Sequence, residues 1–207
     1  MNIDVCIDLI CPWCYIGKRR LQRALGLRPA LQAHLKWQPF MLNPTMPETG
    51  MDRKGYLLNK FGTESRVRRL LGALEVTGQS EEINFNFDTI ENTPNTRNAH
   101  RLVRYADAFG QSEPVVEALF RAYFVEGQDI GDMGVLCAVG GSVGLVQKDL
   151  EGYLESSQDV AWVDQQNAIT HQLGINGVPC YVINGEMALQ GAQPAEVLAR
   201  LLDAAAA

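Results

Sequence analysis

Two cysteines near the start of the chain stand two residues apart, in the sequence Cys11-Pro12-Trp13-Cys14. An apolar run typical of a β-strand precedes them, and a helical pattern covers residues 15–25. A CxxC pair at a strand-to-helix junction is typical of a thioredoxin-like redox motif. Two ordinary buried cysteines, or half of a metal site, are the alternatives. The junction, the proline and the spacing together favour redox chemistry, in which the two thiols interconvert with a disulfide.

The two thiols of this motif are predicted to have different roles. Pro12 suits the first turn of a helix, because it lacks an N–H and has a fixed φ. Cys11 therefore lies at or just before the helix N-cap, where free backbone N–H groups and the helix dipole favour a thiolate. Cys14 lies one turn further in, within reach of a disulfide. Since a thiolate attacks a disulfide, we expect Cys11 to be the nucleophile and Cys14 the resolving thiol.

The composition is that of an ordinary globular protein. The chain has 207 residues, of which 46% are hydrophobic, and a net charge of −6 from 24 acidic and 18 basic residues. This charge indicates neither a nucleic-acid partner nor an anionic membrane. The chain opens without a signal-peptide pattern, no apolar run reaches membrane-spanning length, and five cysteines are an odd number. We therefore expect a cytoplasmic protein without a structural disulfide framework.

The elements around the motif predict a strand–helix–strand unit, with strands at residues 2–9 and 34–40 in parallel pairing. After Asn43-Pro44, helical patterns repeat without a convincing strand. A helix at 159–173, a hairpin around Asn184-Gly185 and a final helix at 195–202 complete the chain. This order predicts an α/β, thioredoxin-like fold with an inserted all-helical domain. We place the thioredoxin-like domain at 1–44 and 159–207, and the helical insertion at 45–158.

The other candidate ligands and nucleophiles receive structural interpretations. Cys6 and Cys137 lie in apolar surroundings and are expected to be small core residues. Cys180 follows Pro179 directly, and we favour a buried strand thiol over a third catalytic one. The histidines at positions 34, 100 and 171 are expected on the surface or in satisfied structural roles. No spacing suggests zinc, so we predict no metal site.

Several segments of the chain resemble DsbA-family oxidoreductases of the FrnE-like branch. In order, they are residues 10–20 around the CxxC pair, 42–44, 92–96 with 99–101, 119–124 with 126–132, 177–179 and 191–193. The resemblance covers essentially the whole chain. It implies a thioredoxin fold with an inserted helical domain, thiol–disulfide exchange at the CxxC pair, and a cis peptide bond before Pro179.

The expected cis bond gives Pro179 a place in the site. It would set the backbone groups of Val178 facing Cys11, where an extended peptide or glutathione could pair with them. A trans proline before an edge strand is the alternative. The exposed aromatic Trp13 is expected either to contact the substrate or to pack over the disulfide.

Four further residues are candidate substrate or glutathione contacts. Gly191, Ala192 and Gln193 precede the final helix and could hold a carboxylate at its N-terminus, or could form a turn only. Asn43 could border the pocket, although breaking the strand is its favoured role.

The pair of cysteines decides between two classes of enzyme. Similar proteins with this architecture, 2-hydroxychromene-2-carboxylate isomerase and kappa-class glutathione transferase, place a serine where Cys11 stands and use bound glutathione. The presence of Cys11 and Cys14 favours a thiol–disulfide oxidoreductase acting on a protein or small-molecule substrate. A glutathione-dependent isomerase or transferase of an aromatic small molecule is the alternative, and a non-catalytic binding module is a third. We expect no bound cofactor beyond the redox-active disulfide, with glutathione a candidate co-substrate, and no nucleic-acid or membrane partner.

Overall fold

A four-stranded mixed sheet lies at the centre of the thioredoxin-like part, in the order β2–β1–β5–β6. The computed structural model describes residues 1–206. The strands are β1 (Asn2–Ile7), β2 (His34–Pro39), β5 (Cys180–Ile183) and β6 (Met187–Gln190). β1 runs parallel to β2 and antiparallel to β5, and β5 and β6 form the hairpin. The predicted parallel pairing and the hairpin are confirmed.

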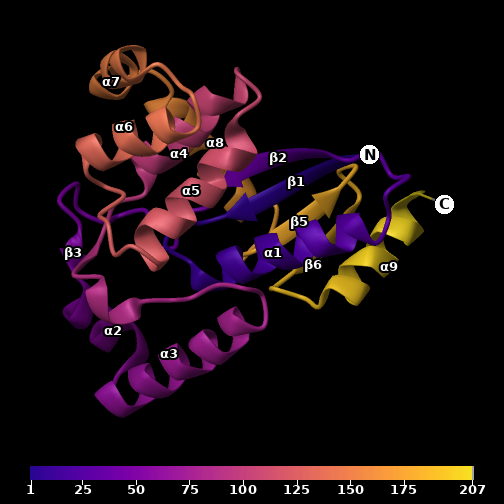
Figure 1. Ribbon diagram of the computed structural model, residues 1–207, viewed down its shortest axis with the longest axis horizontal. Coiled ribbons are helices and arrows are strands. Elements are labelled where there is room, and N and C mark those ends of the chain that lie inside the picture. The colour runs from indigo at the N-terminus through magenta and orange to yellow at the C-terminus, as the bar shows by residue number, and fades with distance from the viewer. Residues whose placement is uncertain (207) are drawn as a thin grey trace.

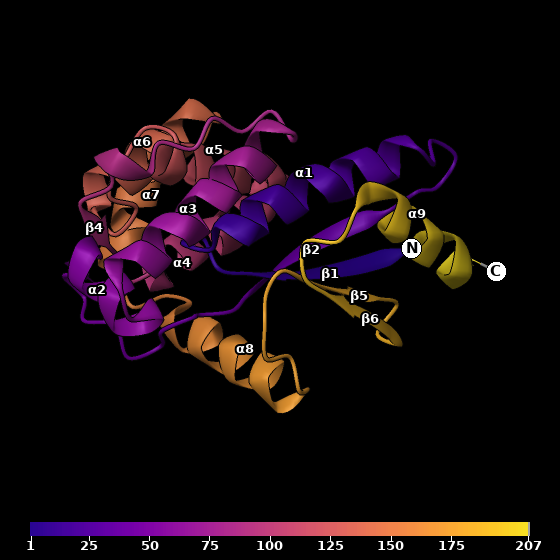
Figure 2. The ribbon, with the colours of Figure 1, turned by 90° about the horizontal axis from the view of Figure 1, so that it is seen from below.

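Helices cover both faces of this sheet (Figures 1 and 2). Helices α1 (Pro12–Gly26) and α9 (Ala195–Ala206) lie side by side on one face, and α8 (Val160–Gln172) lies on the other. Because side chains alternate along a strand, β1 contributes to two cores. Ile3, Val5 and Ile7 belong to the main core, whereas Cys6 belongs to a smaller one with Phe40, Ile175 and Cys180.

The segment between β2 and α8 is mostly helical and packs beside the start of α1 (Figure 1). Its helices are α2 (Arg53–Phe61), α3 (Glu64–Gln79), α4 (Arg97–Asp107), α5 (Ser112–Phe124), α6 (Met133–Ser142) and α7 (Gln147–Glu155). The predicted α/β, thioredoxin-like fold with a helical insertion is confirmed. The division at residues 45 and 158 stays a prediction, and Ala207, the predicted end of the segment 159–207, lies outside the described residues.

The insertion also contains a short antiparallel ladder that the sequence did not indicate. Strand β3 (Met51–Asp52) pairs with β4 (Asn92–Thr93). Helix α2 begins directly after β3, at Arg53, and the Asp52 carboxylate caps it by accepting a hydrogen bond from the Gly55 backbone at 2.7 Å. Two residues per strand are too few for a recognisable alternation, so only the pairing partner reveals these strands.

The insertion and the sheet share one hydrophobic core. The Tyr15 ring on α1 stacks on Phe120 of α5, with 5.1 Å between ring centroids, and meets the edge of Phe85 at 6.1 Å. The start of α1 is thus enclosed by side chains from both parts of the chain.

Residues 1–206 contain no helix that is both long and apolar enough to cross a lipid bilayer.

Candidate active site

The CxxC motif lies at the N-terminus of α1, where the chain leaves β1. Cys11 is the N-cap residue and Pro12 is the first residue of the helix, as the sequence predicts. The Cys11 backbone N–H donates to the Asp8 carbonyl at 3.0 Å, and the Cys14 N–H donates to the Cys11 carbonyl at 2.9 Å. Cys11 is 6% exposed and Cys14 is fully buried. Both thiols are thus buried, and Cys11 is the more exposed of the two, in the order that the sequence predicts.

Burial controls the ionisation of the inner thiol. It raises the pKa of Cys14 well above its ordinary value, and the neighbouring Cys11 adds to this effect. The backbone amide of Asp8 acts in the opposite direction, because it can donate a hydrogen bond to the Cys14 sulfur. Cys14 therefore stays protonated near neutral pH until its proton is removed for reaction.

The loop before β5 lies directly opposite Cys11. The Val178–Pro179 peptide bond is cis, as the resemblance implied. The Cys11 thiol donates to the Val178 carbonyl across 3.7 Å. α1 approaches this loop closely because Gly17 has no side chain: a Cβ there would lie 2.6 Å from the Pro179 ring and would also strike the Tyr181 hydroxyl. The glycine thus permits the packing that brings Cys11 and Val178 together.

A buried carboxylate that the sequence interpretation missed lies beneath the motif. Asp8 is fully buried, and its Oδ2 accepts a hydrogen bond from the Leu42 backbone at 2.7 Å. Its Oδ1 lies 3.8 Å from Nε2 of His100, on α4. His100 is also buried, and its Nε2 has no hydrogen-bond partner within the described residues, so the expected surface or satisfied role is wrong. The position of Asp8 in the apolar run before Cys11 was the sequence signal that could have revealed this buried carboxylate.

A cavity of about 330 Å³ opens beside Cys11, between the motif, the Val178 loop and helices α2 and α3. Trp13, which is 42% exposed, forms part of its wall. Most of the wall is apolar, and it includes Arg53, Tyr56 and Lys60 from α2. The sequence indicated none of these three residues, because they lie in a helix about 40 residues after the motif.

None of the four candidate contacts forms part of the wall of this cavity. The Asn43 side chain accepts a hydrogen bond from the Thr45 hydroxyl at 3.0 Å. The Gly191 N–H donates to the Pro179 carbonyl at 2.7 Å, and the Ala192 carbonyl accepts from the Arg20 guanidinium on α1 at 2.6 Å. The Gln193 amide donates to the Gln190 carbonyl at 3.0 Å. These contacts shape loops, and a role for the four residues in substrate binding stays a prediction.

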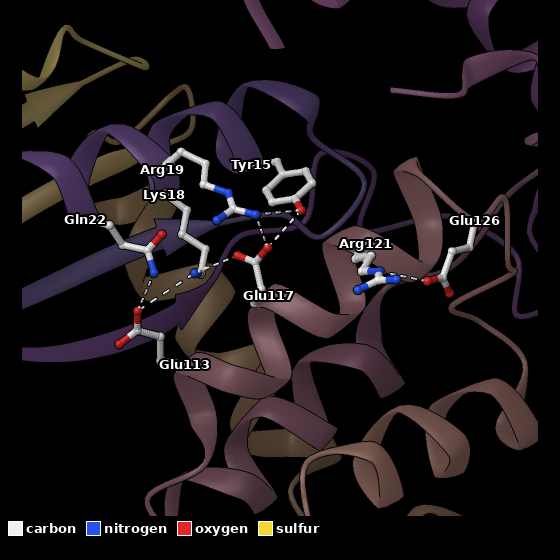
Figure 3. Close-up of polar contacts among 8 residues, drawn as sticks. All are labelled: Tyr15, Lys18, Arg19, Gln22, Glu113, Glu117, Arg121 and Glu126. Atoms are coloured by element: carbon white, nitrogen blue, oxygen red, sulfur yellow. Dashed lines mark hydrogen bonds and ion pairs between the residues drawn. The ribbon is translucent and has the colours of Figure 1, made fainter. Parts of the chain in front are cut away.

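Helix α1 is fixed to the insertion by a partly buried ion-pair cluster (Figure 3). The Glu117 carboxylate on α5 accepts hydrogen bonds from Tyr15 at 2.9 Å, Lys18 at 2.8 Å and Arg19 at 2.6 Å. Burial alone would raise the pKa of Glu117, but the Lys18 charge and the hydrogen bonds from Lys18 and Tyr15 hold it below its ordinary value. We call these four residues the Glu117 cluster; it fixes the helical turn that directly follows Cys14.

The remaining cysteines do not join the site. Cys6 and Cys180 are buried and face each other across β1 and β5, and burial raises their pKa values to about 12 and about 11. Their predicted buried positions are confirmed. Cys137 on α6 is only partly buried, so its predicted core position is only partly correct.

A strand leading into a helix-capping CxxC pair, with a cis-proline loop opposite, is the arrangement of a thioredoxin-like domain. The chain belongs to the DsbA-like family: the family model described as a DSBA-like thioredoxin domain matches residues 2–203. This confirms the family resemblance found in the sequence.

Three known proteins are similar to this chain over nearly its whole length. The uncharacterized protein YwbO of Bacillus subtilis (strain 168) is 25% identical over 207 residues, covering 98% of this chain and 96% of YwbO. A probable DsbA oxidoreductase from Streptomyces coelicolor has a TM-score of 0.90 and 25% identity, covering 99% of this chain and 89% of that one. The cytosolic disulfide reductase DsbM from Pseudomonas aeruginosa, crystallised with GSH, has a TM-score of 0.70 and 17% identity, covering 99% and 98%. The last match shows a shared fold alone.

Proposed function

We propose that the protein is a thiol–disulfide oxidoreductase in which Cys11 attacks and Cys14 resolves. The observation that carries this proposal is the asymmetry of the pair. Cys11 caps α1 and lines the cavity, whereas Cys14 is fully buried one turn later. Of the two sulfurs, only that of Cys11 therefore lies at the cavity, where a substrate disulfide could reach it.

The proposed reaction has two exchange steps. The Cys11 thiolate attacks one sulfur of a substrate disulfide, so that a mixed disulfide forms and the other substrate sulfur leaves as a thiolate. Cys14 then loses its proton and attacks the Cys11 sulfur, which releases the second substrate thiol and forms the Cys11–Cys14 disulfide. The substrate is reduced by two electrons and the pair is oxidised by two. Substrate oxidation is the same sequence in reverse.

The Val178 loop is proposed to hold the substrate during exchange. The Val178 carbonyl oxygen lies 3.7 Å from the Cys11 sulfur, and Val178 lines the cavity. A backbone carbonyl at this position can accept a hydrogen bond from an extended peptide or from glutathione. Protein disulfides and glutathione-like thiols are therefore the proposed substrate classes, and the cytoplasm is the proposed compartment.

Replacement of each cysteine tests this mechanism. Cys14→Ser should leave the first attack intact and trap a mixed disulfide on Cys11, because the resolving thiol is missing. Cys11→Ser should abolish attack, since Cys14 is buried and protonated. The measurements are reduction of insulin and mass spectrometry of adducts. Cys137→Ser, which changes a thiol on remote α6, is the matched control and should behave as the wild type.

The opposite result is expected of a glutathione-dependent isomerase or transferase. Glutathione would supply the working thiol there, so Cys14→Ser would be nearly silent and Cys11 would carry no adduct. Full dithiol activity in Cys14→Ser would refute the exchange mechanism proposed for this pair.

A further inference from the structure

Arg53 is a buried cation without an acidic partner. It begins α2, lines the cavity beside Cys11 and is 8% exposed. Its Nη1 donates to the Tyr123 hydroxyl at 2.9 Å, and its guanidinium lies over the rings of Phe87 and Tyr123, at 5.8 and 5.7 Å from their centroids. No Asp or Glu among residues 1–206 lies within 4.0 Å of its nitrogens.

The other buried cations of the fold are well compensated. Lys18 pairs with Glu117 at 2.8 Å. Arg101, which is 1% exposed, donates to the backbone carbonyls of Tyr153, Leu154, Ser156 and Gln158 and to the Asn98 side chain. A buried charge without such partners is strongly unfavourable, so buried cations are normally paired. Arg53 has five N–H donors and one neutral side-chain partner, which leaves donors for an anion in the cavity.

The other residues of the cavity wall indicate the kind of ligand to which the anionic group would belong. The wall is predominantly apolar, with side chains such as Leu42, Leu57, Phe61 and Leu71, and it contains no Asp or Glu. Lys60, also on α2, adds a second cation whose ammonium contacts the Tyr56 hydroxyl at 3.1 Å. The ammonium group of a zwitterion such as glutathione would find no carboxylate here. An apolar ligand with a net negative charge matches both features.

We propose that this cavity binds apolar carboxylic acids, with the apolar body along α2 and α3 and the carboxylate on Arg53. A planar guanidinium suits a carboxylate because it can make two parallel hydrogen bonds to it. The volume of about 330 Å³ is sufficient for one aromatic or branched aliphatic group. Because Cys11 lines the same cavity, this narrows the small-molecule substrates of Cys11 to apolar acids that bear a thiol or disulfide, which the cavity favours over glutathione. This last step rests on the proposed function, whereas binding of the acid does not.

The first test measures binding without any redox chemistry. The reduced full-length protein is titrated calorimetrically with 4-phenylbutyrate and with the neutral 4-phenylbutanamide. The acid should bind at least about tenfold more tightly, because charge-assisted hydrogen bonds exceed neutral ones by that order. Arg53→Gln should remove this preference and leave the amide affinity unchanged. Arg121→Gln, which alters an exposed arginine on α5, is the matched control and should keep the preference.

A second measurement connects the bound acid to Cys11. Saturating 4-phenylbutyrate should slow alkylation of Cys11 by iodoacetamide severalfold and leave alkylation of the partly buried Cys137 unchanged. If Arg53→Gln does not fold, the ratio of acid to amide affinity in the wild-type protein decides alone. Equal affinities, or reduced glutathione binding more tightly than the acid, would overturn the proposal. These results are independent of the Cys14→Ser experiment, so either proposal can fail while the other stands.

Discussion

Replacing Glu117 with glutamine tests how strongly the insertion holds the catalytic helix. The substitution keeps the shape of the side chain and removes the charge opposite Lys18, whose side chain is 1% exposed. Removing one partner of a buried ion pair costs about 3–5 kcal/mol, because the remaining charge stays buried. The Glu117 side chain is 27% exposed, and Glu113 lies 3.8 Å from the Lys18 ammonium. Both facts favour the lower end, about 3 kcal/mol.

The ion pair between Arg121 of α5 and Glu126 supplies a control for this substitution. Glu126, just beyond the end of α5, pairs with Arg121 at 2.9 Å, and their side chains are 39% and 68% exposed (Figure 3). An exposed pair of this kind contributes less than about 1 kcal/mol, so Glu126→Gln should be nearly neutral. Urea unfolding followed by circular dichroism measures both free energies of unfolding. By thermal unfolding, Glu117→Gln should lower Tm by about 6–12 °C.

The comparison of the two variants decides the outcome. If Glu117→Gln loses no more free energy of unfolding than Glu126→Gln, the Glu117 cluster does not fix α1, and the reasoning from burial is refuted. If Glu117→Gln has a lower free energy of unfolding but keeps full activity in the insulin assay, the cluster stabilises the fold without positioning Cys14.

Three further outcomes follow from burial and packing. The wild-type protein should have a larger free energy of unfolding than Glu117→Gln, and acid unfolding of both proteins measures this difference. The difference should be complete above the unfolded-state carboxyl pKa of about 4.3 and should fade as pH falls through the lowered native pKa of Glu117. At pH 8, iodoacetamide should modify Cys6 and Cys180 far more slowly than Cys11, because burial raises both pKa values; equal rates by peptide mapping would contradict this. Gly17→Ala should lose about 1–3 kcal/mol of stability through overpacking against the cis-proline loop, whereas Gly72→Ala, in open space on α3, should be neutral or stabilising in the same urea assay.

The sequence predicted the features that local physics controls. Pro12 at the first helical position, the apolar run before it and the CxxC spacing together predicted the junction that the structure contains. The Asn184-Gly185 turn predicted the β5–β6 hairpin in the same way. These features depend on residues that are neighbours in the chain, so pattern and propensity were sufficient.

Features that depend on distant pairing could not be predicted in this way. His100 stands beside Asp8 only because α4 packs against the sheet at β2, and no periodicity in α4 distinguishes that position from others on its buried face. Arg53 was equally hidden, since a cation at a helix start is expected in solvent. Conversely, Gln193 follows a glycine turn that suggested a ligand site, but its side chain hydrogen-bonds the preceding Gln190 carbonyl.

The polar groups buried around the motif indicate why the two parts of the chain depend on each other. Asp8 meets His100, and Lys18 meets Glu117; in each pair, one residue belongs to the β1–α1 unit and the other to the insertion. A buried charge is tolerated only where its partner is in place, so separating the two parts would leave Lys18 without its carboxylate. Apolar packing between Tyr15 and Phe120 acts in the same direction but tolerates small shifts. Charged pairs require a defined geometry, and this requirement fixes α1, and with it Cys11 and Cys14, relative to the cavity wall that the insertion provides.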